Sequence, residues 1–292
     1  MNRAIENEYL YVEVSDHGAE LMRIVRKDTN TEMLWNGDPK FWTYRSPILF
    51  PNVGRTYENK VKIDGKEYQT KQHGIAREMD FVCVEEQAEH LRYCLASDEA
   101  TRAYYPFDFA LYISYTLQEK KILVKWEVEN RSETKMHFTI GGHPAFMFEQ
   151  AGEAKEDYEL YFPGMERLTA TAVDLVEGVG KPDQKYEVVL EEGSYPLSDQ
   201  VFDVDTLVFD DAQVREVWLR KKESKRPYIG VHSEDFYSFG IWSLPKAPYV
   251  CLEPWAGRCD DEGFAEDISQ KKGINEAKPG EIWEKAYEIL IG

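Results

Sequence analysis

Apolar and polar residues alternate with a period of two along almost the whole chain, and this pattern limits its fold more than any other feature. The alternating stretches are residues 8–14, 60–69, 109–117, 121–130, 214–220 and 281–290. Successive side chains of a strand point to opposite faces, so such stretches predict half-buried β-strands. Helical patterns are few and short: residues 97–105, with Ser97 as the expected N-cap, and residues 198–203, with Ser198. The chain therefore predicts an all-β fold.

Turn signals organise these strands. Asp64-Gly65 is a tight hairpin signal within residues 60–69, and Glu119-Lys120 separates two long alternating runs that we expect to pair. Residues 149–200 are rich in Glu, Gly and Pro, and we interpret them as long surface loops with short strands. No linker or repeat divides the chain, so we expect one domain over residues 1–292, with two large antiparallel sheets packed face to face.

The charge balance excludes some classes of partner. The 292 residues include 54 Asp and Glu against 35 Lys and Arg, a formal net charge of −19. Binding to nucleic acids or to anionic membranes relies on clustered basic residues, so neither partner is expected. A small neutral ligand is compatible with this charge. With 42% hydrophobic residues, the chain can bury a substantial core.

The four cysteines argue against a structural metal site. Cys83, Cys94, Cys251 and Cys259 show no C-x-x-C spacing, which disfavours a zinc cage. Unpaired thiols in a chain of this size fit a reducing compartment better than a disulfide framework. The N-terminus lacks the apolar segment of a signal peptide, and no run of about 18 apolar residues occurs. We expect a cytoplasmic protein, either a monomer or a homodimer.

The common cofactor motifs are absent. The chain has no P-loop, no dinucleotide-binding glycine motif after a strand, no H-E-x-x-H and no G-x-S-x-G. What remains are polar residues in loops and at strand ends. Arg55 closes SPILFPNVGR, and QHGIAR carries His73 and Arg77. A histidine and two guanidinium groups so close together could hold hydroxyl groups or an anion, although Arg55 could equally cap a loop.

His143 lies in a constrained bend, GGHPAF, directly after a predicted strand. The glycines allow unusual backbone geometry and Pro144 restricts the exit, so the imidazole could be held at a fixed angle for acid–base chemistry. Taken alone, a single histidine is more often structural. A metal ligand is the third possibility.

Glu253 is the most informative carboxylate. In YVCLEPW it follows an apolar strand directly and is bracketed by Leu252, Pro254 and Trp255. Desolvation disfavours the charged form and raises the pKa of such a carboxyl group, as a general base at neutral pH requires. The alternative is a structural carboxylate paired with an arginine. Asp205, before the strand TLVF, is a further candidate, although it could simply be a turn residue.

These stretches also carry a family resemblance. SPILFPNVGR, QHGIAR, YPFDF, GGHPAF and CLEPW, in this order and spacing, resemble the aldose 1-epimerase (mutarotase) superfamily, and within it the LacX-type branch. The resemblance spans essentially the whole chain. It implies the galactose mutarotase-like β-supersandwich with few short helices. It also implies interconversion of the α and β anomers of an aldose, with no metal and no cofactor.

The resemblance implies a role for each candidate residue. Glu253 corresponds to the general base and His143 to the general acid, which acts as an imidazolium. A desolvated glutamate and a histidine, whose unperturbed pKa is about 6.5, can be tuned to these opposite protonation states. His73 and Arg55 correspond to residues that hold the sugar. The family's active-site aspartate is assigned to Asp205, where three other aspartates crowd the same stretch: Asp203, Asp210 and Asp211.

Three rivals to a mutarotase of free hexoses stay open. The first is a hexose-6-phosphate 1-epimerase with Arg55 and Arg77 on the phosphate, and the second is a non-catalytic sugar-binding protein. The third is a glycoside hydrolase that uses Glu253 with Asp205. In each case the partner is a small sugar, and one aromatic side chain is expected to cover a sugar face: Trp42, Phe146 or Trp255.

Overall fold

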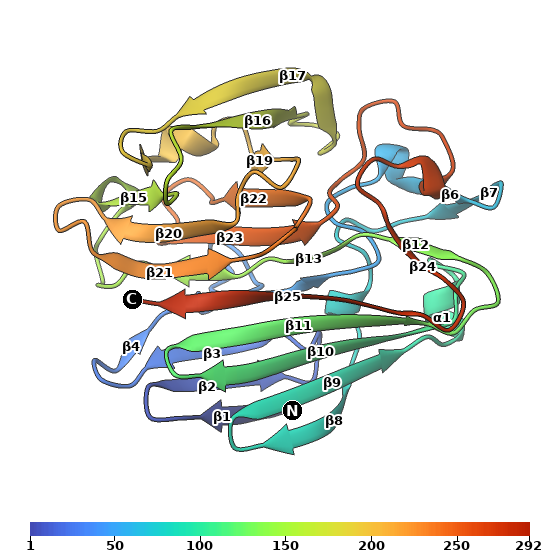
Figure 1. Cartoon of the computed structure of the whole chain (residues 1–292), viewed down its shortest axis with the longest axis horizontal. Helices are drawn as coiled ribbons and strands as arrows, with labels where there is room; N and C mark the ends of the chain where they lie inside the picture. The colour runs from blue at the N-terminus through green and yellow to red at the C-terminus, as the bar shows by residue number, and fades with distance from the viewer.

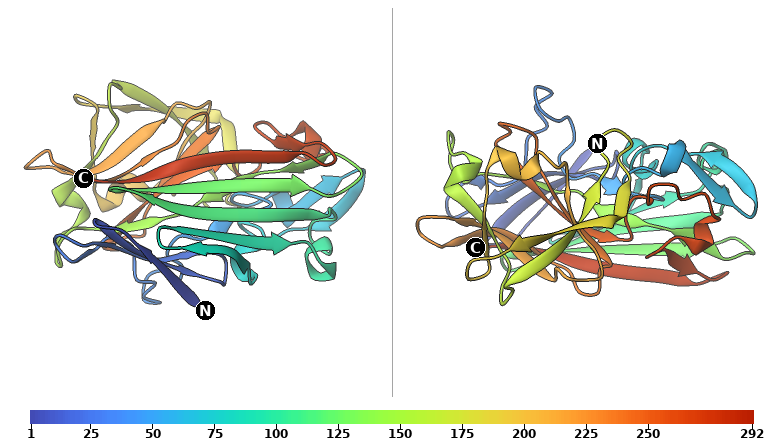
Figure 2. Two further views of the ribbon diagram at one scale, coloured as in Figure 1. Left: turned by 60° about the horizontal axis from the view of Figure 1, so that its bottom comes forward. Right: turned by 90° about the horizontal axis from the view of Figure 1, so that it is seen from above.

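The computed structural model describes residues 1–292 and contains 25 strands, one single-turn α-helix and five short 3₁₀-helices. Figure 1 and Figure 2 show two large curved sheets with smaller hairpins at their margins. All the strand pairs inside the sheets are antiparallel, so the prediction of an all-β fold with large antiparallel sheets is confirmed.

The first large sheet has nine strands and includes the long β25, β11 and β10, which lie side by side in Figure 1. In spatial order its strands are β18 (Ser194–Pro196), β15 (Tyr158–Tyr161), β20 (Glu216–Lys221), β21 (Pro227–His232), β25 (Ile282–Ile291), β11 (Lys121–Asn130), β10 (Phe109–Gln118), β9 (His90–Ala96) and β8 (Val82–Gln87).

The second large sheet has eight strands and carries the candidate site residues Glu253 and His143 at its centre. In spatial order its strands are β17 (Gly180–Val189), β16 (Arg167–Val173), β19 (Leu207–Phe209), β22 (Ser238–Trp242), β23 (Tyr249–Ala256), β13 (Ile140–Gly142) and β5 (Ile48–Leu49), with β14 (Ala145–Met147) also paired to β23.

The remaining elements are small. The four-stranded sheet is β1 (Asn2–Glu6), β2 (Leu10–Ser15), β3 (Leu21–Arg26) and β4 (Thr31–Glu32), and the two-stranded ones are β12 (Met136–Phe138) with β24 (Asn275–Ala277) and β6 (Lys60–Ile63) with β7 (Lys66–Gln69). The helices are η1 (Tyr57–Asn59), η2 (Ala76–Glu78), α1 (Glu99–Arg102), η3 (Lys155–Asp157), η4 (Asp199–Phe202) and η5 (Ile268–Gln270).

Both predicted hairpins are confirmed, and each turn explains its register. In β6–β7 the turn residues Asp64 and Gly65 have φ of 48° and 77°, the positive values that a two-residue hairpin turn requires. In β10–β11 the pairing runs from Gln118 opposite Lys121 to Phe109 opposite Asn130. Burial alternates along β11, as the period-2 pattern predicts for a strand with one face in the core.

The two predicted helices form, but their caps differ from expectation. The N-cap of α1 is Asp98 rather than Ser97, because the Asp98 carboxylate accepts a hydrogen bond from the Thr101 N–H at 2.8 Å. The Thr101 hydroxyl accepts from the Asp98 N–H in return, which completes a reciprocal cap. Ser198 does precede η4, but its side chain makes no capping hydrogen bond.

The interpretation of residues 149–200 as long surface loops with short strands is correct in part, but the segment holds more strand than expected. It contains β15, β16, the ten-residue β17 and β18. The strand β17 was missed because it forms the edge of its sheet and most of its side chains are exposed, so it shows no apolar alternation.

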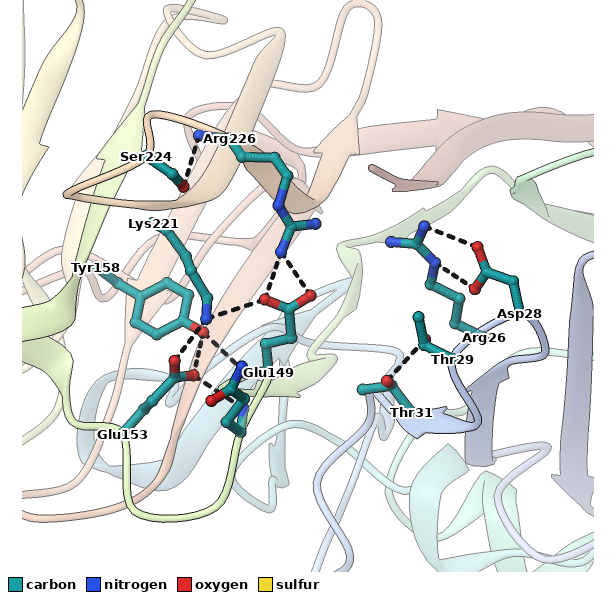
Figure 3. Close-up of polar contacts among 11 residues, drawn as sticks. Arg26, Asp28, Thr29, Thr31, Glu149, Glu153, Tyr158, Lys221, Ser224 and Arg226 are labelled. Carbon is teal, nitrogen blue, oxygen red and sulfur yellow. Dashed lines mark hydrogen bonds and ion pairs between the residues drawn. The ribbon is translucent and has the colours of Figure 1, made fainter.

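Part of that segment, the connection between β14 and β15, is tied down by ion pairs (Figure 3). Lys221 donates to Glu153 at 2.6 Å and lies 3.1 Å from Glu149, which also pairs with Arg226. The Tyr158 hydroxyl donates to the Glu153 carboxylate at 2.6 Å. The connection is thereby fixed to the neighbouring β20–β21 hairpin.

The main core is a hydrophobic cluster of 61 buried residues drawn from both large sheets. It includes Trp126 from β11 and Phe239 from β22, whose facing sheets it joins. None of the helices has the length and the apolar character that crossing a membrane would require.

Candidate active site

A cavity of about 320 Å³ opens over the centre of the eight-stranded sheet. Its volume is in the range of small-molecule sites. Five predicted site residues line it: His73, Arg77, His143, Asp205 and Glu253. The sixth, Arg55, is not part of the lining. Its side chain packs against Gly178 at the cavity rim, where a Cβ on the glycine would lie 2.9 Å from the Arg55 Cδ.

The register of the sheet brings His143 and Glu253 together. The short strands β13 and β14 pair with the same neighbour, β23, on either side of a gap: Gly141 lies opposite Trp255, and Ala145 lies opposite Cys251. Counting inward from both sides places His143 directly across from Glu253. Side chains at opposed positions of an antiparallel pair are close neighbours, so the pairing itself builds this contact.

Two prolines explain the gap in the ladder. Pro144 and Pro254 both lie within it, and neither has a backbone N–H to donate. The Leu252 N–H still donates to the Pro144 carbonyl at 3.2 Å, which keeps the two chains adjacent. The interruption frees His143 from regular strand geometry without separating it from β23.

The two side chains touch in an environment almost without water. The His143 Nε2 lies 3.2 Å from the Glu253 Oε2, and the two residues are 6% and 1% exposed. This contact does not have hydrogen-bond geometry, and neither carboxylate oxygen of Glu253 nor the Nδ1 of His143 has another partner. These buried polar atoms are therefore available to a ligand.

Burial shifts the two pKa values in opposite directions. Desolvation raises the pKa of Glu253 well above its ordinary value, and the nearby Asp205 carboxylate raises it further. Desolvation lowers the pKa of His143 to about 3, with a smaller contribution from Arg77. This lowered pKa disfavours the imidazolium form that the expected general-acid role of His143 requires. Burial therefore favours a proton on Glu253 over a proton on His143.

His73 is held as a neutral hydrogen-bond donor. Its backbone has a positive φ of 65°. The ring Nδ1 of His73 accepts a hydrogen bond from the Gly54 N–H at 3.1 Å, and the backbone N–H of His73 donates to the Gly54 carbonyl at 2.8 Å. Burial lowers the pKa of His73 well below its ordinary value, and neighbouring His143, Arg77 and Arg55 lower it further. With Nδ1 as the acceptor, the proton of the neutral ring is on Nε2.

Arg77 contributes an uncompensated positive charge to the cavity. Its guanidinium stacks over the ring of Tyr44 at 4.7 Å, and Nη2 donates to the Gln72 carbonyl at 2.9 Å. Its buried Nε has no partner, and no carboxylate lies within ion-pair distance. Most other arginines of this acidic chain are paired with a carboxylate.

Asp205 is the aspartate of its stretch that lines the cavity. Its φ is 69°, and its carboxylate accepts a hydrogen bond from the Thr206 hydroxyl at 2.8 Å. Asp203 ends η4, whereas Asp210 is buried and accepts hydrogen bonds from Arg258.

Aromatic rings form one wall of the cavity. Trp42 lies against the imidazole of His143 with ring centroids 4.6 Å apart, and Trp242 meets the same imidazole edge-on at 5.7 Å. Trp255 also lines the cavity, but Phe146 is fully buried in the main core and does not. Trp242 and Tyr44 were not among the candidates selected from the sequence. For Trp242 the missing information is its place opposite Cys251 in the β22–β23 register.

The arrangement suits proton transfer to and from a polyhydroxylated ligand. The imidazole of His143 and the carboxyl group of Glu253 lie in contact and line the cavity, hydrogen-bond donors come from His73 and Arg77, and an aromatic wall offers an apolar face. Sugars combine hydroxyl edges with apolar C–H faces. One set of side chains also has the chemistry of a metal site, since donor atoms of His143, Cys251 and Glu253 all lie within 4.8 Å of one another.

Known proteins resemble this chain over its full length. The family described as aldose 1-epimerase matches residues 3–289. The plasmid-encoded protein LacX of Lactococcus lactis subsp. lactis is 28% identical over 299 residues, covering 100% of this chain and 99% of LacX.

Solved structures agree with the sequence match. A galactose mutarotase related enzyme from Lactobacillus acidophilus superimposes with a TM-score of 0.94 at 30% identity, covering 100% of this chain and 97% of the other. A galactose mutarotase-like protein from Lactobacillus casei gives 0.90 at 25% identity, with both chains fully covered. The galactose mutarotase-like fold expected from the sequence is confirmed. The chain belongs to the aldose 1-epimerase family.

Proposed function

We propose that this protein is an aldose 1-epimerase, an isomerase that interconverts the α and β anomers of a hexose by opening and closing the sugar ring. The observation that carries the proposal is the contact between His143 and Glu253, which both line the cavity. In a cyclic aldose the ring oxygen O5 and the hydroxyl oxygen O1 are both bonded to C1. An acid for one and a base for the other must therefore be neighbours.

The proposed cycle uses one proton shared by His143 and Glu253, and the position of this proton differs before and after ring opening. In the reactive form the proton is on His143 and Glu253 is a carboxylate. Glu253 takes the proton of the C1 hydroxyl while His143 donates its proton to O5, and the C1–O5 bond breaks to give the open-chain aldehyde. The pair still holds one proton, now on Glu253. This is the arrangement that burial favours.

Reversal of the same transfers completes the reaction. Rotation about C1–C2 presents the other face of the aldehyde to the O5 hydroxyl. Glu253 returns its proton to the carbonyl oxygen, His143 takes the proton of O5, and the ring closes as the other anomer. Each residue acts once as acid and once as base, so the enzyme ends as it began.

The other cavity residues would hold the sugar during this cycle. The Nε2–H of His73 and the guanidinium of Arg77 would donate to hydroxyl groups, and the Asp205 carboxylate would accept from one. Trp42 or Trp255 would cover an apolar face. No step requires a metal or a cofactor, so activity should survive treatment with EDTA.

A hexose 6-phosphate is a second candidate substrate, supported by a specific observation. Arg77 lines the cavity without a carboxylate partner, and a phosphate ester is the substituent that such a guanidinium binds best. Arg55, which packs behind the rim, could add to the positive field.

The test is polarimetry, or saturation-exchange NMR, of freshly dissolved α-glucose, α-galactose and glucose 6-phosphate. We expect anomerisation above the spontaneous rate with wild type and a loss of at least about 10²-fold for Glu253→Gln and for His143→Asn. No acceleration with any of these sugars would reject the epimerase and favour a sugar-binding protein. Release of reducing sugar from a glycoside would favour a glycoside hydrolase.

A further inference from the structure

Cys251 is a buried thiol at the acid–base pair that the proposed reaction does not use. It precedes Glu253 by two residues on β23, so both side chains point to the same face of the sheet. Its Sγ and donor atoms of His143 and Glu253 all lie within 4.8 Å of one another. The three residues are between 0% and 6% exposed.

The polar atoms of this group lack partners in the protein. Both carboxylate oxygens of Glu253 and the Nδ1 of His143 make no hydrogen bond. A sugar would engage the carboxylate and one imidazole nitrogen, but the thiol has no evident role toward a hydroxyl group. A thiol, an imidazole and a carboxylate together form a donor set that Zn²⁺ takes. The set fits Mg²⁺ and Ca²⁺ poorly, because these cations prefer oxygen ligands.

The site's position favours a metal with an open coordination position. Three protein ligands leave the fourth position of a tetrahedral Zn²⁺ free for water, and here that position would face the cavity. Zinc binds about 2.0–2.3 Å from such donors, so side-chain rotations must draw the three atoms somewhat closer together.

The charges also balance. A thiolate and a carboxylate together offset the two positive charges of the ion, and the protons of the thiol and of the acid–base pair are released on binding. The positive charge of Arg77 at the cavity disfavours a bound cation, whereas the negative charge of the Asp205 carboxylate, which also lines the cavity, favours it.

We propose that His143, Cys251 and Glu253 form a binding site for Zn²⁺, and that zinc bound there inhibits the enzyme. The metal occupies the nitrogen and the oxygen that must exchange protons with the sugar. Only the inhibitory consequence rests on the proposed function, because the binding site itself follows from the donor atoms.

The test of binding uses Co²⁺ as a spectroscopic substitute for Zn²⁺. Titration of the wild-type protein should give a near-ultraviolet thiolate-to-cobalt absorption band that saturates at one equivalent. The band should be absent from Cys251→Ala. In Glu253→Gln the apparent affinity for Co²⁺ should be at least tenfold weaker. Cys259→Ala is the control, since Cys259 is also a buried cysteine, lines the cavity and lies outside the proposed donor set, and it should keep the band. No band in wild type, or a band that survives in Cys251→Ala, would overturn the site.

Inhibition is tested separately by polarimetry with and without ZnCl₂. Zinc should suppress anomerisation by wild type and by Cys259→Ala, EDTA should restore it, and MgCl₂ should have no effect. Equal zinc inhibition of Cys251→Ala would overturn the proposal. If a cobalt band appears but no sugar is anomerised, the metal site stands and the proposed function fails, so the two failures are distinguishable.

Discussion

Gly74 packs directly onto the backbone of Phe50. The carbonyl of Phe50 accepts hydrogen bonds from the N–H groups of Ile75 and Ala76 at 2.8 and 3.1 Å, which holds the turn after His73 against the end of β5. A Cβ at position 74 would collide with this carbonyl and would lie 2.7 Å from the Pro51 nitrogen. The φ of Gly74, 74°, also disfavours any other residue.

Gly74→Ala should therefore destabilise the protein and displace His73. We expect the free energy of unfolding, measured by urea denaturation, to fall by more than the about 1–3 kcal/mol that backbone strain alone costs, because the collision with the backbone adds to it. Gly65→Ala is the control, since Gly65 has a similar φ of 77° but has nothing within 4 Å of the added Cβ. Equal losses for the two variants would show that the close approach to Phe50 is unimportant.

The stability of the protein should depend on pH through Glu253. Its pKa is raised in the folded protein, so the fold keeps a proton that the unfolded chain releases above pH 4.5. The stabilisation from this group is complete below that pH and is lost as the pH rises. Glu253→Gln removes the effect, so its stability relative to wild type should grow with pH by up to about 1.4 kcal/mol per unit.

Urea denaturation at several pH values between 5 and 8 measures this difference. Glu67→Gln, which removes a carboxylate at an exposed position, is the control variant. His143 should change the stability in the opposite direction with pH. Its pKa is lowered to about 3, so its contribution is lost as pH falls below 6.5, and His143→Gln should gain relative stability there. A pH-independent difference for Glu253→Gln would contradict the raised pKa.

The buried pair Asp210–Arg258 should be important for stability. The Asp210 carboxylate accepts hydrogen bonds from the Arg258 Nε at 3.0 Å, from Ser238 on β22 at 2.7 Å and from Thr171 on β16 at 3.0 Å. Asp210→Ala leaves the buried guanidinium short of a partner and should cost about 3–5 kcal/mol in urea denaturation. Asp28→Ala, which removes the exposed partner of Arg26 (Figure 3), should leave the urea midpoint nearly unchanged.

Arg77→Met should separate the two candidate substrates. Loss of a charged hydrogen-bond donor should lower kcat/KM for glucose 6-phosphate by about 10- to 100-fold if the phosphate binds there, and much less for free glucose. Polarimetry of both sugars measures this, with Arg215→Met as a control because Arg215 is exposed and unpaired. Equal losses on the two sugars would argue that Arg77 binds hydroxyl groups instead.

The sequence was most informative where a local pattern determines the structure. The β10–β11 hairpin follows from alternation and a polar turn, both of which lie within one short stretch. It was misleading where tertiary context decides. The edge strand β17 has no buried face to impose alternation, and Phe146 belongs to the core because its strand turns that side chain inward.

For the site, single residues were easier to find than their relationships. Local surroundings singled out Glu253 and His143, but their contact depends on pairing between segments more than a hundred residues apart. The low pKa of His143 follows from that burial and could not be read from GGHPAF. The spacing of Cys251 to the other cysteines disfavoured a metal site, whereas the fold places its thiol near the side chains of Glu253 on the same strand and of His143 on the neighbouring segment.

The shared register of β13 and β14 on β23 has a consequence for how this protein can change through evolution. Insertion or deletion of one residue between Tyr249 and Trp255 would turn Glu253 to the opposite face of the sheet and away from His143. His73, Arg77 and Asp205 lie outside this ladder, so a length change beside them would not turn Glu253 away from His143.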